Sequence, residues 1–244
     1  DCTSELMLDY LGYLNSQGCE ASTCNNRLAA LRAYLWYASD MDISLQSIAL
    51  SASHVPFIKE AKKEKQIIQD KDIKTLLAAP PDTQKGNRDR MIMILLYDTA
   101  IRIAKLLELK ISSLKLTSVP SIHIHGKGDK ERIVYFDART KLHLQEYLIS
   151  REDDNEALFV GLRNPHNRVT INGIELRIRN LGRNVGIKKC HPHKFRRTLA
   201  TMAIDKGMPI EQLQQLLGHK RIDTTLQYAM VKQSNVKLAH KKYI

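Results

Sequence analysis

The pattern of apolar and polar residues divides the chain into two stretches joined by a charged segment. In the first stretch, apolar residues recur every three or four positions over 3–18 and again over 24–39, which predicts two amphipathic helices. Gly18 is expected to end the first of them. Residues 59–66, KEAKKEKQ, carry charge without an apolar stripe, which indicates a linker. The sequence therefore predicts one domain over 1–66 and a second over 67–244.

The second stretch is mostly of helical period and contains one short interruption. A helix is expected from Asp70 to the Pro80–Pro81 pair, followed by a strongly apolar helix over 88–110. Residues 121–136, SIHIHGKGDKERIVYF, alternate β-branched and aromatic residues around two glycines, which is typical of a hairpin. Helical patterns then continue to the end of the chain. The predicted fold class is mainly α with a small antiparallel β-sheet.

Charge changes this picture by indicating a partner. The chain has 38 Lys and Arg against 26 Asp and Glu, a net charge of +12. Residues 1–69 hold 6 basic and 8 acidic residues, so the whole excess lies in the second stretch. Such an excess suits a polyanion, although a basic surface that only aids solubility is the alternative.

Other classes of protein fit the composition poorly. No apolar run reaches the roughly 18 residues of a membrane span, and the first residues lack the pattern of a signal peptide. The four cysteines are too few and scattered for a disulfide framework, which predicts reduced thiols in a cytoplasmic protein. Cys190, His191 and His193 lie close together but do not recur at zinc-site spacing, so we predict no metal.

Two cations lie in unusual surroundings. Arg102 falls within the apolar 88–110 segment, where an unpaired guanidinium would be costly to bury, and its ordinary interpretation is an ion pair with Asp98 or Glu108. Lys127 lies between two glycines of the hairpin turn, where a flexible turn can carry its ammonium group into a site formed elsewhere. The ordinary interpretation of Lys127 is a solvated lysine.

Two further strings combine histidine with arginine or tyrosine. His193 and Arg196 are three residues apart, so a helix would project both from one face. His219 ends one predicted helix, and Tyr228 lies inside the next. Taken singly, the histidines would be helix-end residues and the tyrosine would be packed core.

The strings TAIRIAKLLELK, HGKGDKERIVYF, HPHKFRRTLAT and LLGHKRIDTTLQY resemble, in order and spacing, the four signature boxes of the tyrosine site-specific recombinases, the phage integrase family. The resemblance implies a helical core-binding domain over 1–66 and an α+β catalytic domain with a three-stranded sheet over 67–244. It also implies that the chain begins inside the core-binding domain. Within the family we favour a mobile-element integrase over a housekeeping resolvase.

By this resemblance, the protein cuts and rejoins double-stranded DNA at a recombination site through a 3′-phosphotyrosyl intermediate, without metal, cofactor or ATP. Such a reaction suits the residues, because paired guanidiniums match the charge that develops on a phosphodiester. An ordinary tyrosine has a pKa of about 10, so it needs a base or cationic neighbours to attack at neutral pH. The implied roles are Tyr228 as nucleophile, Arg102 and Arg196 as phosphate ligands, Lys127 as general acid, and His193 and His219 as the two histidines.

Three positions depart from the family pattern: Ala100 replaces a usual glycine, Lys105 a common glutamate, and Arg197 a common histidine. Lys105 puts like charge one turn from Arg102. The family also implies a homotetramer on two DNA sites, for which apolar positions of the tail after Tyr228 are candidates. The alternatives are a type IB topoisomerase, which would relax DNA without exchanging strands, and a non-catalytic helical DNA-binding regulator.

Overall fold

The computed structural model describes residues 4–60, 66–125 and 131–228. The chain divides into two compact units, 1–65 and 66–244, which we describe separately. The assignment of these units to a core-binding and a catalytic domain stays a prediction at this point. Over the described residues, no helix combines the length and the hydropathy that crossing a bilayer requires.

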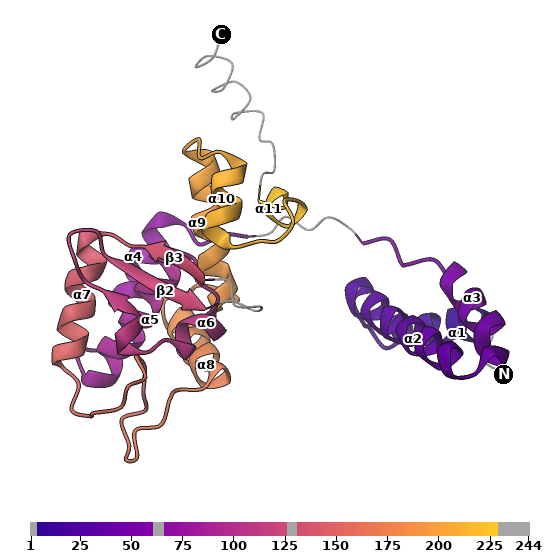
Figure 1. Cartoon of the computed structure of the whole chain (residues 1–244), viewed down its shortest axis with the longest axis horizontal. Helices are drawn as coiled ribbons and strands as arrows, with labels where there is room; N and C mark the ends of the chain where they lie inside the picture. Colours follow the sequence, from indigo (N-terminus) through magenta and orange to yellow (C-terminus); the bar gives the residue numbers. More distant parts are fainter. Residues whose placement is uncertain (1–3, 61–65, 126–130, 229–244) are drawn as a thin grey trace, which may run out of the picture. The chain divides into compact units, whose positions relative to one another are not determined.

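The first unit is a small helical body (Figure 1). Its elements are α1 (Ser4–Ser16), α2 (Ala21–Met41), the 3₁₀ helix η1 (Ile43–Leu45) and α3 (Gln46–His54). Gly18 has a φ of +74° and allows the chain to turn after α1, as predicted. Of the predicted apolar stripe of α2, Leu28 and Leu35 are buried, whereas Leu31 and Trp36 are exposed. The buried face of α2 is therefore narrower than its pattern suggested.

Arg32 of α2 has a structural task in this unit. Its Nε donates to the carbonyl of Ala52 at 2.9 Å, and Nη2 donates to that of Val55 at the end of α3. Its guanidinium also lies 4.6 Å from the ring centroid of Phe57. Arg32 therefore joins α2 to the chain after α3, while Arg27 on the same helix is exposed.

The second unit combines helices with one small sheet (Figure 1). Its helices are α4 (Asp70–Ala78), α5 (Gln84–Thr99), α6 (Ile103–Glu108), the 3₁₀ helix η2 (Ile111–Ser113), α7 (Ala138–Ile149), α8 (Ile171–Asn184), α9 (Pro192–Asp205), α10 (Ile210–Leu217) and α11 (Asp223–Leu226). Its strands are β1 (Leu114–Lys115), β2 (Ser121–His125) and β3 (Glu131–Tyr135), antiparallel in the order β1-β2-β3. The predicted fold class, mainly α with a small antiparallel sheet, is confirmed.

Helix α5 is the centre of the core of this unit, because it packs against α4, α6, α7, α8 and α9. Its apolar residues are buried on several sides of the helix, as expected for a helix enclosed by others. They are Met91, Ile92, Met93, Leu95 and Leu96, each at most 1% exposed.

The predicted helix over 88–110 is wrong in one respect that matters for the site. Helix α5 ends at Thr99, Ala100 adopts a left-handed conformation with a φ of +49°, and α6 begins at Ile103. Thr99 stabilises the break, because its Oγ1 donates to the carbonyl of Leu95 at 2.6 Å and accepts from the amide of Ile101 at 3.3 Å. Arg102 is consequently the exposed N-cap residue of α6 rather than a residue inside an apolar helix.

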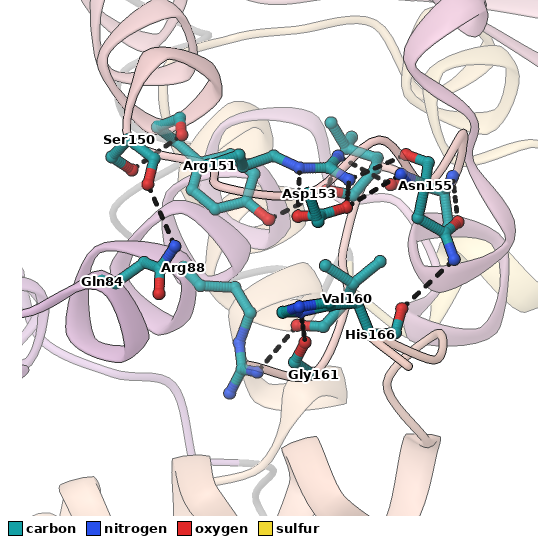
Figure 2. A network of polar contacts seen from close by, with 12 residues as sticks. Gln84, Arg88, Ser150, Arg151, Asp153, Asn155, Val160, Gly161 and His166 are labelled. Carbon is teal, nitrogen blue, oxygen red and sulfur yellow. Dashed lines mark hydrogen bonds and ion pairs between the residues drawn. The ribbon is translucent and has the colours of Figure 1, made fainter. Parts of the chain in front are cut away.

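The long connection between α7 and α8 is held by polar contacts (Figure 2). Arg151 forms a buried ion pair with Asp153 and donates from Nη1 to the carbonyl of Ala157 at 2.8 Å. The same ion pair lowers the pKa of Asp153. Arg88 of α5 donates to the carbonyl of Val160 at 2.9 Å, which ties the connection to the core helix. These arginines are therefore part of the scaffold.

Candidate active site

Arg196 is fixed deep in the second unit by α9. Arg196 is only 4% exposed. Its Nη1 donates to the carbonyl of Ala100 in the break between α5 and α6. Nη2 donates to the carbonyl of Leu217 and to Nε2 of His219, the latter at 3.0 Å. The guanidinium thus joins three segments distant in sequence, which leaves it little freedom to rotate.

His219 follows α10, and its two ring nitrogens have different partners. Because the guanidinium of Arg196 can only donate, Nε2 of His219 accepts, so Nδ1 carries the proton and donates to Oγ1 of Thr225 at 2.9 Å. Burial, then the charges of Arg196, Arg102 and Arg132, lower the pKa of His219 to about 4. The imidazole is therefore neutral at physiological pH.

Tyr228 lies beside this pair, two residues beyond the end of α11. Its ring is stacked on that of His219, with centroids 6.2 Å apart and an interplanar angle of 14°. Its amide donates to the carbonyl of Thr225 at 2.9 Å, so Thr225 contacts both His219 and the tyrosine segment. Burial and the charge of Arg102 lower the pKa of Arg196 to about 10, while Tyr228 raises it through its charge and a hydrogen bond.

Arg102 faces the same cluster without the ion pair that was its ordinary interpretation. Among the described residues, Asp98 instead accepts from the amide of Asp137 at 3.1 Å, and Glu108 pairs with Lys105 at 2.6 Å. Lys105, one of the departures from the family pattern, is thereby neutralised within α6. Arg102 is near enough for its charge to lower the pKa of Arg196 and of His219.

The two remaining predicted residues are placed differently. His193 is exposed on the first turn of α9. The pKa of the nearby His191 is lowered first by burial, then by the charge of Arg197 and then by that of His193. Within the described part of the chain, no hydrogen bond joins His193 to Arg196. Lys127 lies outside the described residues. The structure thus brings Arg196, His219 and Tyr228 into contact beside Arg102, and leaves the roles of all six residues as predictions.

Two residues of the candidate active site, Thr225 and Arg132, were not predicted from the sequence. Thr225 orients His219, and no motif could have shown this because the contact depends on how the chain turns between α10 and α11. Arg132 of β3 lowers the pKa of Arg196 and His219 by its charge. The sequence did hold a sign of Arg132. This residue lies two residues before the buried Val134 in an alternating strand, which puts both side chains on the same face of the sheet.

The environment of Cys190 is unsuited to a metal ligand. The thiol is buried against Gly182, and burial raises its pKa to about 11, the opposite of the thiolate that a zinc ion needs. In the part of the chain that the structure describes, no group of three His, Cys, Asp or Glu residues is arranged to hold a metal ion.

Comparison with known proteins identifies the family of the chain. Residues 66–235 match the profile of the phage integrase family. The chain belongs to the phage integrase family. Relatives of this family member include proteins named tyrosine recombinase XerC from Staphylococcus saprophyticus and Staphylococcus carnosus, each 30% identical to it. Both matches cover 91% of this chain and 75% of the relative. The chain is therefore a tyrosine recombinase, an enzyme of site-specific DNA recombination.

Solved structures of other recombinases share its fold. A crystal structure of XerA recombinase is 26% identical, with a TM-score of 0.63, and the match covers 98% of this chain and 90% of that one. The Tn1549 transposon integrase in complex with transposon right end DNA has a TM-score of 0.80 at 17% identity, covering 99% and 85% of the two chains. At that identity the transposon integrase bears on the fold alone, so the role in a mobile element stays a prediction.

Proposed function

We propose that Tyr228 of this tyrosine recombinase is the nucleophile that attacks a DNA phosphodiester. The bond from the tyrosine oxygen to phosphorus forms as the bond from phosphorus to the 5′ oxygen breaks, which gives a 3′-phosphotyrosyl link and a free 5′ hydroxyl. The tyrosine proton passes to His193, and Lys127 supplies the proton of the 5′ hydroxyl. The observation that carries this proposal is the stacking of Tyr228 on His219, which holds Arg196.

The two arginines suit the phosphate on different grounds. Arg196 is preorganised, because its partners hold it before DNA binds, and a fixed donor needs little reorganisation during the reaction. Arg102 is exposed at the start of a helix and forms no ion pair with any described carboxylate, so its charge is available to an incoming anion. A neutral His219 accepts from Arg196 without adding a charge to the cluster.

The substrate we propose is duplex DNA at a recombination site. Residues 70–244, the stretch that carries Tyr228, hold 32 Lys and Arg against 18 Asp and Glu, so the whole positive excess lies there. Phosphate contacts would supply most of the affinity, whereas contacts to bases and the deformability of the duplex would select the site. We assign the first unit to the core-binding domain and the second to the catalytic domain. We also place the reaction in the cytoplasm, consistent with the free thiols of Cys19, Cys24 and Cys190.

We further propose that the recombinase acts as a homotetramer on two DNA sites. Exchange of strands between two duplexes needs four active sites, and a cyclic exchange of tails would close a ring. Val236, Leu238 and Tyr243 give the tail apolar positions on an otherwise polar and basic segment. A hollow of about 530 Å³ beside α9, with a mostly apolar lining that includes Met202 and Met208, is a candidate to receive such a tail.

Covalent trapping tests the reaction. The protein is incubated, in the presence of EDTA, with a nicked site. After cleavage of this site, the short fragment that ends in the free 5′ hydroxyl dissociates, so the adduct cannot be reversed. Adducts are then separated on a denaturing gel. Wild type and the control Tyr135→Phe, a change at an exposed tyrosine of β3, should form the adduct. Tyr228→Phe should bind the site and form none. Adduct formation by Tyr228→Phe, or cleavage that requires added Mg²⁺, would contradict the proposal.

A further inference from the structure

Arg132 occupies a position in β3 that would ordinarily be apolar. In the register of the sheet, Arg132 lies opposite Ile124, and the next pair on that face is Val134 opposite Ile122. These three apolar residues are all at most 5% exposed, whereas Ile133 on the other face is 47% exposed. The side chain of Arg132 therefore starts on the buried face of the sheet, and burial is the main cause that lowers its pKa.

The guanidinium of Arg132 lies against Gly218, at the end of α10. A Cβ on Gly218 would be 2.1 Å from Nη1 and 3.0 Å from Cζ of Arg132, so any side chain there would displace the guanidinium. Gly218 also has a φ of +63°, which a residue with a side chain adopts at a cost. Since His219 follows directly, this contact brings Arg132 to the segment that holds Arg196.

Among the described residues, no carboxylate pairs with the positive charge that the cluster gathers. Across the described residues, neither a hydrogen bond from the guanidinium of Arg132 nor an ion pair of Arg102, Arg132 or Arg196 is found. Arg102 lowers the pKa of Arg132, as expected for like charges held close together. Three neighbouring guanidiniums repel one another until an anion binds between them, and a phosphodiester with two non-bridging oxygens is such an anion.

We propose that Arg132 is a third arginine that contacts the scissile phosphate, and that the absence of a side chain at Gly218 is what admits it. The inference rests on the proposed function and deepens it, because it adds a phosphate ligand to the site of Tyr228. A third guanidinium would further neutralise the charge that develops as the tyrosine oxygen attacks.

The test compares two substrates in single-turnover cleavage of a nicked site. One carries the normal phosphodiester, and the other carries a neutral methylphosphonate at the same position. With the phosphodiester, Arg132→Ala should cleave about 10²-fold more slowly than wild type, the scale of losing one preorganised donor. With the methylphosphonate, the deficit should shrink to below about tenfold, since less charge needs balancing. Arg139→Ala, which removes an exposed arginine of α7, should stay within about twofold of wild type on both.

Two results would overturn the inference while leaving the proposed function intact. One is adduct formation by Arg132→Ala at nearly the wild-type rate, and the other is an equal deficit on both substrates, which would indicate a structural role only. Failure of the proposed function is recognised separately, because wild type would then form no adduct or Tyr228→Phe would still form one. Thermal unfolding of each variant, compared with wild type, shows whether a loss of cleavage is a loss of folding.

Gly218 offers an independent test of the contact. Gly218→Ala should slow cleavage when Arg132 is present, and it should slow it much less when Arg132 is already alanine, because the displaced group is then missing. An equal slowing in both backgrounds would mean that Gly218 acts through its backbone conformation alone, and it would remove the claim that its lack of a side chain admits Arg132.

Discussion

Replacing Thr225 by valine should slow DNA cleavage, because the hydroxyl of Thr225 holds His219 in its orientation. Thr225 is fully buried, and its Oγ1 accepts the Nδ1 proton of His219 at 2.9 Å. Valine keeps the shape and removes the acceptor. The proton then either stays unpaired on Nδ1 or moves to Nε2, where it would face the donating Nη2 of Arg196 at 3.0 Å. Both outcomes disturb the orientation of Arg196.

The magnitude follows from the hydrogen bond that is lost. Leaving one buried donor or acceptor unpaired costs about 1–3 kcal/mol. If that cost falls on the reactive arrangement, the rate of single-turnover cleavage should drop by about 5- to 150-fold. Thr225→Ser keeps the oxygen and should cleave nearly as wild type. The control is Thr224→Val, which makes the same threonine-to-valine change at the exposed neighbouring position. Cleavage by Thr225→Val at the wild-type rate would refute the reasoning that Thr225 sets the tautomer of His219.

Other predictions test separate parts of the site. Arg196→Ala should lower cleavage by about 10² or more but weaken DNA binding in a gel-shift assay much less, and equal losses would make it only an anchor. Lys127→Ala should be rescued by a 5′-thio leaving group, which departs without a proton, and lack of rescue would remove it as the acid. The pKa of His219 measured by NMR should be about 4 and not 6.5. Between these two pH values the unfolded protein binds a proton that the folded protein does not, so the free energy of unfolding falls as the pH drops from 6.5 to about 4. Deletion from Gln233 onward should keep single-site binding and abolish the synaptic complex in sedimentation; normal synapsis would refute the role of the tail.

The elements of this fold were predictable where a short stretch of sequence carries a clear pattern of its own. The hairpin was visible as a change of period around Gly126 and Gly128, and α9 as a helical pattern that spaces His193 and Arg196 three residues apart. The break after Thr99 was not predictable in the same way, because Ala100 gives no sign of a left-handed residue. The break is fixed by tertiary contacts, including the donation from Arg196 to the carbonyl of Ala100.

The candidate site shows the same division between local and long-range information. Arg196, His219 and Tyr228 could be named because four strings together resemble the signature boxes of the family in order and spacing, whereas each string alone would be weak. The task of Thr225 could not, since a threonine near a helix start has many uses and only the folded chain puts its hydroxyl on Nδ1 of His219. Arg132 was within reach, because the period-two pattern of β3 puts it on the buried face of the sheet.

The most direct test of the account is to identify the tyrosine that carries the DNA. The trapped adduct is digested with protease and nuclease, and tandem mass spectrometry locates the residue that bears the 3′ nucleotide. We predict a nucleotide on Tyr228 and none on the same peptide of Tyr228→Phe. A nucleotide on Tyr97 or Tyr243, or on any residue other than Tyr228, would contradict it.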